Sequence, residues 1–112
     1  MSLPLIKISD SKSITVVPSS PAKLVDKYWQ VYTFWAEPVS TNQQSVIKWR
    51  KRNVTGAYEA IQTLDLGPNM KAMDPCVAAK GRNILVSFRG IDRANPVAWQ
   101  IYEIELVGIL PA

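Results

Sequence analysis

The sequence predicts an all-β fold in which one domain of 112 residues is built from two similar antiparallel units. Three observations predict it. Aromatic and β-branched residues fill the apolar runs, turn-forming residues separate these runs, and the spacing of strands and loops recurs along the chain. With 47% hydrophobic and 20% charged residues, the chain has the composition of an ordinary globular protein with one modest core. Because a chain this short leaves much of its surface exposed, we also expect association with other subunits.

The first 20 residues are expected to form an N-terminal arm or short strands. Two short stretches with alternating apolar residues, 3–8 and 14–17, are separated by the polar run 9–13. Prolines at 18 and 21 then interrupt regular structure, because proline has no backbone N–H to donate and restricts the residue before it to extended geometry.

Residues 28–35 form the clearest predicted strand, since this run is almost wholly aromatic and β-branched. A period of two places Trp29 and Trp35 on one face and Tyr32 and Phe34 on the other, and either face could meet the core. Both tryptophans are expected to be buried. The polar residues 37–44 read as a hairpin loop that leads into a second strand over 45–51.

The second half of the chain repeats this course. A turn at 53–56 precedes residues 57–66, which suit a helix or a strand and which we assign to a strand. After a loop at 67–71, the segment 74–79 leads through a turn at 80–83 into a strand over 84–88, and a loop at 90–96 leads into a last strand over 98–106. The tail 107–112 is short and apolar. Cys76, the one cysteine, lies in an apolar setting and is expected to be a buried structural thiol.

An internal repeat relates the two halves at an offset of 54 residues, the distance from Pro21 to Pro75. The loops between the paired strands are equal in length at this offset. The offset also matches residues of similar type: Val31 with Leu85, Thr33 with Ser87, Phe34 with Phe88 and Ile47 with Ile101. We therefore expect residues 21–56 to form repeat 1 and residues 57–106 to form repeat 2, followed by the tail 107–112.

The second repeat resembles a blade of the sialidase-like β-propellers. The resemblance rests on the proline-led run 74–88, with its tight turn, and on the alternating residues 99–102. It implies about two blades, whereas propellers close with roughly 4 to 8 blades, so closure would require a homo-oligomer such as a trimer. The family's Asp-box is absent from the equivalent hairpin at 50–58, and no functional residue is carried over. A β-sandwich, monomeric or assembled, explains nearly the same pattern.

The residue types present argue against an enzyme. The chain has no histidine, the commonest general base and transition-metal ligand. Its carboxylates are scattered singly except for Glu103 and Glu105, which share one face of a strand and read as a solvated face. No phosphate-binding glycine loop or nucleophile motif occurs. We therefore predict no catalytic residues, no cofactor and no metal.

The net charge of +4 permits an anionic partner. The one dense basic cluster, residues 48–52, alternates so that a strand would divide it between two faces. It reads as a solvated strand end or a charge-protected edge, and nucleic acid is not expected as a partner. We also expect no signal peptide and no membrane span, because no apolar run has the required length.

The aromatic residues are the feature most suggestive of function, because tryptophan and tyrosine are enriched at protein interfaces and where sugars stack. The candidate interface or ligand residues are Trp49, Trp99, Arg50, Arg52, Arg89, Arg93 and Tyr102. We expect a non-enzymatic structural or interaction subunit of a symmetric homo-oligomer, most specifically a phage or virus particle component such as a tail or capsid decoration protein, contacting itself and other virion proteins. The alternative is an oligomeric lectin that binds glycans through aromatic pockets.

Overall fold

The computed structural model describes residues 21–38, 45–94 and 99–112, and within them it is all-β, which confirms the predicted fold class. The strands are β1 (Ala22–Val25), β2 (Val31–Pro38), β3 (Ser45–Arg52), β4 (Gln62–Thr63), β5 (Met70–Lys80), β6 (Asn83–Asp92) and β7 (Gln100–Leu106). The arms predicted at 3–8 and 14–17 lie outside the described residues.

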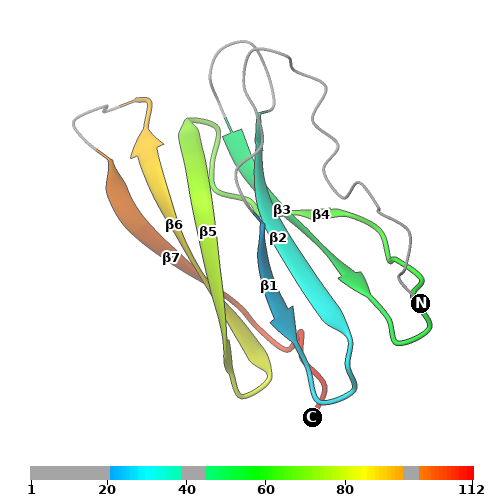
Figure 1. Ribbon diagram of the computed structural model, residues 1–112. Coiled ribbons are helices and arrows are strands. Elements are labelled where there is room, and N and C mark those ends of the chain that lie inside the picture. Colours follow the sequence, from blue (N-terminus) through cyan, green and yellow to red (C-terminus); the bar gives the residue numbers. More distant parts are fainter. Residues whose placement is uncertain (1–20, 39–44, 95–98) are drawn as a thin grey trace.

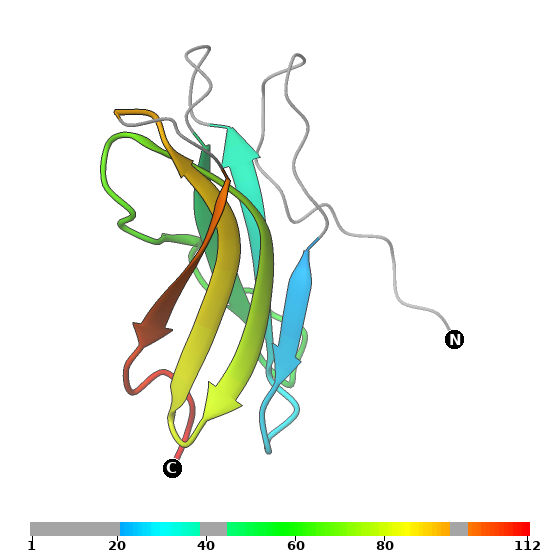
Figure 2. The same cartoon turned by 90° about the vertical axis from the view of Figure 1, so that its left-hand side faces the viewer.

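The seven strands form one hydrogen-bonded sheet that consists of two antiparallel units. Strands β1, β2, β3 and β4 pair in chain order, and so do β5, β6 and β7. The two units join through a short parallel pairing of β3 with β5, at Ser45 and Lys71, where the Ser45 hydroxyl donates a 2.7 Å hydrogen bond to the Ala72 carbonyl. Figures 1 and 2 show the two units lying one over the other as two layers.

The core lies between the two layers. β2 contributes Tyr32 and Phe34, β3 contributes Ile47, and β6 contributes Val86 and Phe88, all of them buried. Alternation along each strand places these apolar side chains on the face that meets the other layer. The burial of this shared core holds the two units together.

Most predicted strands are present with shifted ends. β3 and β6 cover the segments predicted at 45–51 and 84–88, and β7 covers the predicted strand 98–106 from Gln100 on, since Trp99 precedes the strand and Ala98 lies outside the described residues. In the segment 57–66 only Gln62–Thr63 is a strand. β5 begins at Met70, inside a stretch expected to be a loop, and β1 was not expected at all because its four residues carry no aromatic residue and only two β-branched or leucine side chains.

The prediction that Trp29 is buried is wrong. The strand expected over 28–35 begins only at Val31, and Tyr28 and Trp29 lie in the turn between β1 and β2, with Trp29 77% exposed. Trp35 is buried as expected. The turn forms because the Asp26 carboxylate accepts hydrogen bonds from the backbone N–H groups of Tyr28 and Gln30, which shapes the chain locally in place of a strand.

The prediction that Cys76 is buried is also wrong, since the residue is exposed. Strict alternation from the buried Ala72 would place Cys76 on the core face. A β-bulge between Met73 and Cys76 shifts the register, so that Val77 packs against the core instead. The bulge therefore turns the thiol outward.

The strands of the two units correspond at an offset of 54 residues. Adding 54 to the residue numbers of β1, β2 and β3 gives positions that fall, with one exception at the start of β7, within β5, β6 and β7. Each unit contains a stacked cross-strand aromatic pair, Phe34 on Trp49 and Phe88 on Tyr102, both with ring centroids 5.6 Å apart and planes inclined by 17°. The members of the first pair are 15 residues apart and those of the second 14. This difference of one residue reverses the faces of β7 relative to β3, so Ile47 is buried and its matched residue Ile101 is 75% exposed.

Candidate binding surfaces

The outward face of β5, β6 and β7 holds a shallow groove of about 330 Å³ beside Trp99. Cys76, Ser87 and Ile101 contribute to its lining. The guanidinium of Arg89 lies 5.1 Å from the centre of the Trp99 ring and the Lys71 ammonium lies 5.8 Å from it. Arg89 lines the groove, and Trp99, which is 41% exposed, borders it through this contact with Arg89. The groove and its border thus bring together two of the sequence-predicted residues, Trp99 and Arg89.

The groove also contains the carboxylate of Asp74, a residue within the β-bulge of β5. Asp74 has a positive φ of 55°, a conformation that a non-glycine residue adopts at some cost in energy. Its carboxylate forms a 2.8 Å ion pair with Arg89. The Asp74 and Arg89 side chains are both about half exposed, so the pair can offer donors and acceptors to a ligand that contacts Trp99.

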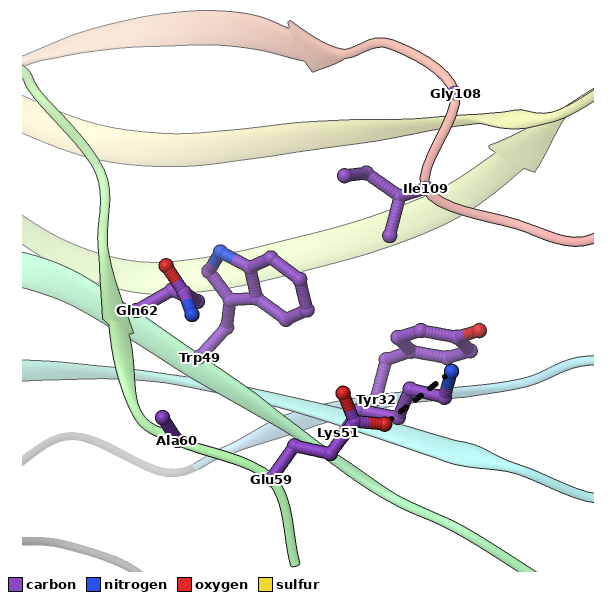
Figure 3. Close-up of a pocket in the computed structure, with 8 residues that line it drawn as sticks. All are labelled: Tyr32, Trp49, Lys51, Glu59, Ala60, Gln62, Gly108 and Ile109. Carbon is purple, nitrogen blue, oxygen red and sulfur yellow. Dashed lines mark ion pairs between the residues drawn. The ribbon is translucent and has the colours of Figure 1, made fainter.

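A second pocket, of about 300 Å³, lies beside Trp49 on the open side of the two layers. Figure 3 shows Trp49 between Gln62 of β4 and Ile109 of the C-terminal segment. Tyr32 also lines the pocket, and Lys51 and Glu59 form a 3.3 Å ion pair at its side. Trp49 is half-buried and packs against the core. The pocket therefore combines a structural aromatic pair with a few polar groups.

The Tyr32 hydroxyl is held beneath this pocket by a 2.8 Å hydrogen bond to Asp26. Burial, together with this hydrogen bond and the negative charges of Asp26 and Glu59, raises the pKa of Tyr32 far above its ordinary value. The phenol is thus neutral across the physiological range and acts as a donor. This residue was missed as part of a candidate site because the sequence pattern indicates only a strand position facing the core.

Arg50 and Arg52 gather on a different surface. Their guanidinium carbons lie 3.9 Å and 5.7 Å from the ring centre of Tyr58, which follows the turn after β3. On the opposite face of β3, Lys51 lies 6.0 Å from the Tyr32 ring. The strand therefore divides the basic cluster between two faces, as expected. Within the described residues β3 is not an edge strand, since it pairs with both β2 and β4.

The two remaining sequence-predicted residues have positions of their own. The backbone N–H of Arg93 donates a 2.8 Å hydrogen bond to the Asn69 carbonyl, which ties the β6–β7 connection to the start of β5. Tyr102 is stacked on Phe88 and packs against the core. It is therefore a packing residue on the face opposite Ile101.

The turn between β1 and β2 is a third surface, and one that the sequence pattern did not indicate as a site. Trp29 and Tyr28 are 77% and 55% exposed, and Trp29 has a positive φ of 65°. Asp26 holds the turn: its carboxylate accepts hydrogen bonds from the backbones of Tyr28 and Gln30, the Gln30 amide and the Tyr32 hydroxyl. Burial alone would raise the pKa of Asp26, but these hydrogen bonds outweigh it and lower the pKa below its ordinary value. A network of charge-assisted bonds therefore displays a tryptophan to solvent.

Groups of three or more histidine, cysteine, aspartate or glutamate side chains placed to hold a metal ion are not found in the described part of the chain. The same part contains no helix with the length and hydropathy needed to cross a membrane.

Comparison with known proteins finds no match among family models, curated protein sequences or solved structures.

Proposed function

We propose that this protein is a non-enzymatic interaction subunit that works as a symmetric homo-oligomer. The observation that carries the proposal is the free edge of β7. Within the described residues β7 pairs with β6 alone, and its outward face carries Ile101, three-quarters exposed, next to the partly exposed Trp99. A strand edge with unpaired backbone groups is a ready template for pairing with another chain.

The charges on β7 bear on the symmetry of the contact. Glu103 and Glu105 both point outward and are not buried. A centred antiparallel pairing of two identical β7 strands would place Glu103 opposite Glu103, and like charges directly opposite each other are destabilising. The β7 edge is therefore better suited to pairing with a different surface of the next copy than with the β7 strand of that copy. Such head-to-tail contacts produce closed rings when the rotation between copies closes, and a trimer is one such ring.

The most specific form of the proposal is a phage or virus particle component, such as a tail or capsid decoration protein. It is supported by the presence of two separate exposed aromatic surfaces, at Trp29 and at Trp99. In a symmetric array, contacts that are individually weak add to a firm attachment through multivalency. Other proteins of the particle would be the partners. The resemblance to propeller blades, with blades completed between copies, belongs to the same proposal.

The test of the proposal is the native mass of the chain, with Ile101→Lys as the disrupting variant. Because Ile101 is exposed within one chain, this substitution leaves the fold intact and places a charge in the contact. We expect a discrete multiple of the chain mass for the wild type and a smaller species for Ile101→Lys. The matched control is Val54→Lys, which alters another exposed apolar residue on the turn after β3 and should keep the wild-type mass.

A lectin is the second candidate function, and the groove beside Trp99 favours it. Sugars stack on aromatic rings and form hydrogen bonds with charged groups at the ring's edge, and Trp99 has Arg89 and Lys71 within 6 Å of its ring centre. We expect binding on a glycan array to disappear in Trp99→Ala and to persist in Trp29→Ala. The absence of binding to any glycan at millimolar concentration would exclude this candidate.

A further inference from the structure

One end of the molecule is built from turns. Strands β1, β3, β5 and β7 run toward this end, and β2 and β6 start from it, as Figures 1 and 2 show at the lower side of each view. The end therefore gathers residues 26–30, 53–56 and 81–82 and the segment after β7. The Lys27 ammonium donates to the Ala112 carbonyl, and the backbone N–H of Leu110 donates to the Arg82 carbonyl at 2.9 Å. These bonds join the β1–β2 turn and the β5–β6 turn to the C-terminal segment, and these segments together with the turn after β3 are called here the turn end.

Exposed apolar side chains concentrate at the turn end. Seven large hydrophobic side chains are exposed in the described residues, and five of them lie here: Val25, Tyr28, Trp29, Val54 and Val107. They come from three different segments: the end of β1 with the β1–β2 turn, the turn after β3, and the segment after β7. Val25, Tyr28 and Trp29 come from one short stretch of chain, and exposed apolar groups that lie together mark a contact with a protein or a membrane.

Trp29 is held outward at an energetic cost. Its backbone adopts the left-handed conformation, with φ at 65°, which bulky side chains rarely adopt. The four hydrogen bonds to Asp26 hold this conformation, while the side chain itself is 77% exposed. Strain that persists at an exposed aromatic residue indicates a function for that residue rather than a packing need.

The turn end also carries positively charged side chains. Lys23, Lys27, Lys80 and Arg82 are exposed at or near the turn end. Two carboxylates lie among these cations, Asp26 and Glu105, and Glu105 forms an ion pair with Lys80. Four cations against two carboxylates give this group of side chains an excess of positive charge, on a protein whose net charge is +4.

We propose that the turn end docks on an anionic lipid surface, with Trp29 and Tyr28 inserted at the level of the headgroups. Tryptophan and tyrosine favour the membrane interface because they combine an apolar ring with a polar tip. Lysine and arginine beside them are attracted to the negative surface of anionic lipids. A lipid surface is favoured over a protein partner because lysine is depleted at protein interfaces, whereas the Lys27 ammonium lies 5.3 Å from the centre of the Tyr28 ring.

The test is sedimentation of the full chain with phosphatidylcholine vesicles, with and without about 30% phosphatidylserine, because surface charge drives this attraction. The wild type should bind the anionic vesicles and bind the neutral vesicles at least about tenfold more weakly. The disrupting variant is Trp29→Gly, which removes the aromatic ring and suits the positive φ. It should weaken binding by about tenfold or more, as expected for the loss of one large inserted side chain.

Thr63→Ala is the control, since it alters an exposed residue of β4, away from the turn end and from the β7 contact, and should leave vesicle binding unchanged. Acyl-chain-brominated lipids should quench tryptophan fluorescence in the wild type and in Thr63→Ala, and much less in Trp29→Gly. The proposal is overturned if the wild type does not sediment with anionic vesicles. It is equally overturned if folded Trp29→Gly binds as tightly as the wild type, because another surface would then carry the contact.

Discussion

Trp29 and Asp74 are the two non-glycine residues with a positive φ in the described part of the chain, and each belongs to a surface with an exposed tryptophan. Trp29 is itself the exposed residue. Asp74 is paired with Arg89, which lies against Trp99. Because a left-handed backbone is unfavourable for residues other than glycine, both positions combine local strain with display of an aromatic group.

Replacing Trp29 with glycine should stabilise the protein. Glycine adopts a φ of 65° without steric cost, and the relief of strain exceeds the added flexibility of the unfolded chain by about 1 kcal/mol. Urea unfolding measures the difference. Trp29→Ala is the control, since alanine keeps the backbone strain and should change stability little. A less stable Trp29→Gly variant would show that the tryptophan side chain packs favourably in the folded state.

Asp26 should make stability depend on pH. Its pKa in the folded protein lies below the ordinary value of 3.8 because the hydrogen bonds to the carboxylate outweigh its desolvation. The ionised carboxylate therefore stabilises the fold above the unfolded pKa, and this contribution is lost as the pH falls through the lower folded pKa. Stability of the wild type should decrease as the pH is lowered through and below the ordinary pKa of 3.8.

Asp26→Asn isolates this effect. The amide cannot accept all four hydrogen bonds, so the variant should lose about 1–2 kcal/mol at neutral pH. The part of the decrease in acid that arises from Asp26 should then be absent, so that wild type and variant approach each other in stability at low pH. Urea unfolding at several pH values measures both. Parallel stability curves for the two proteins would contradict the assignment.

At the scale of single elements, β6 and β7 depend on a close approach at Gly90. A Cβ atom at this position would lie 2.8 Å from the Met70 sulfur and 3.1 Å from ring carbons of Phe88 and of Tyr102. Gly90→Ala should therefore cost about 1–3 kcal/mol, as expected for overpacking in a core. Chemical denaturation measures the loss.

A double-mutant cycle shows whether this loss comes from the contact with Met70. Met70→Ala frees the space in which the new methyl group would lie, so Gly90→Ala should cost less in that background than alone. An equal cost in both backgrounds would assign the loss to the aromatic pair of Phe88 and Tyr102 or to the backbone.

The strands were predictable where local residue preference and tertiary packing agree. β3, β6 and β7 are rich in β-branched and aromatic residues, and their existence follows from the sequence. The start of β2 was misplaced because turn formation by Asp26 overrides the strand preference of Tyr28 and Trp29. The exposure of Cys76 depends on the bulge between Met73 and Cys76. Pro75 is a signal for it, because proline within a sheet is confined to edges, strand starts and bulges, but the sequence pattern alone placed Pro75 near the start of its strand.

The candidate sites were predictable only in part, because side-chain faces depend on register. Trp49 and Trp99 were selected from their neighbours in sequence, and they belong to separate surfaces. Trp49 lines the pocket beside the core, and Trp99 lies against Arg89 on the outward face of β5, β6 and β7. The stacked aromatic residues of the second unit are separated by one residue fewer than those of the first unit. As a result Ile101 points outward and Tyr102 points inward. The Asp26 network and the gathering of turns at one end involve residues distant in sequence, which no local pattern specifies.

At the scale of the whole molecule, the proposed function requires that copies of the chain associate through the edge of β7. Native mass spectrometry of the full chain at neutral pH tests this requirement most directly. The proposal predicts a single discrete multiple of the 12.5 kDa chain mass, with threefold as the simplest closed ring, and its loss in Ile101→Lys but not in Val54→Lys. A wild-type protein that remains at the mass of one chain at micromolar concentration would contradict the proposal.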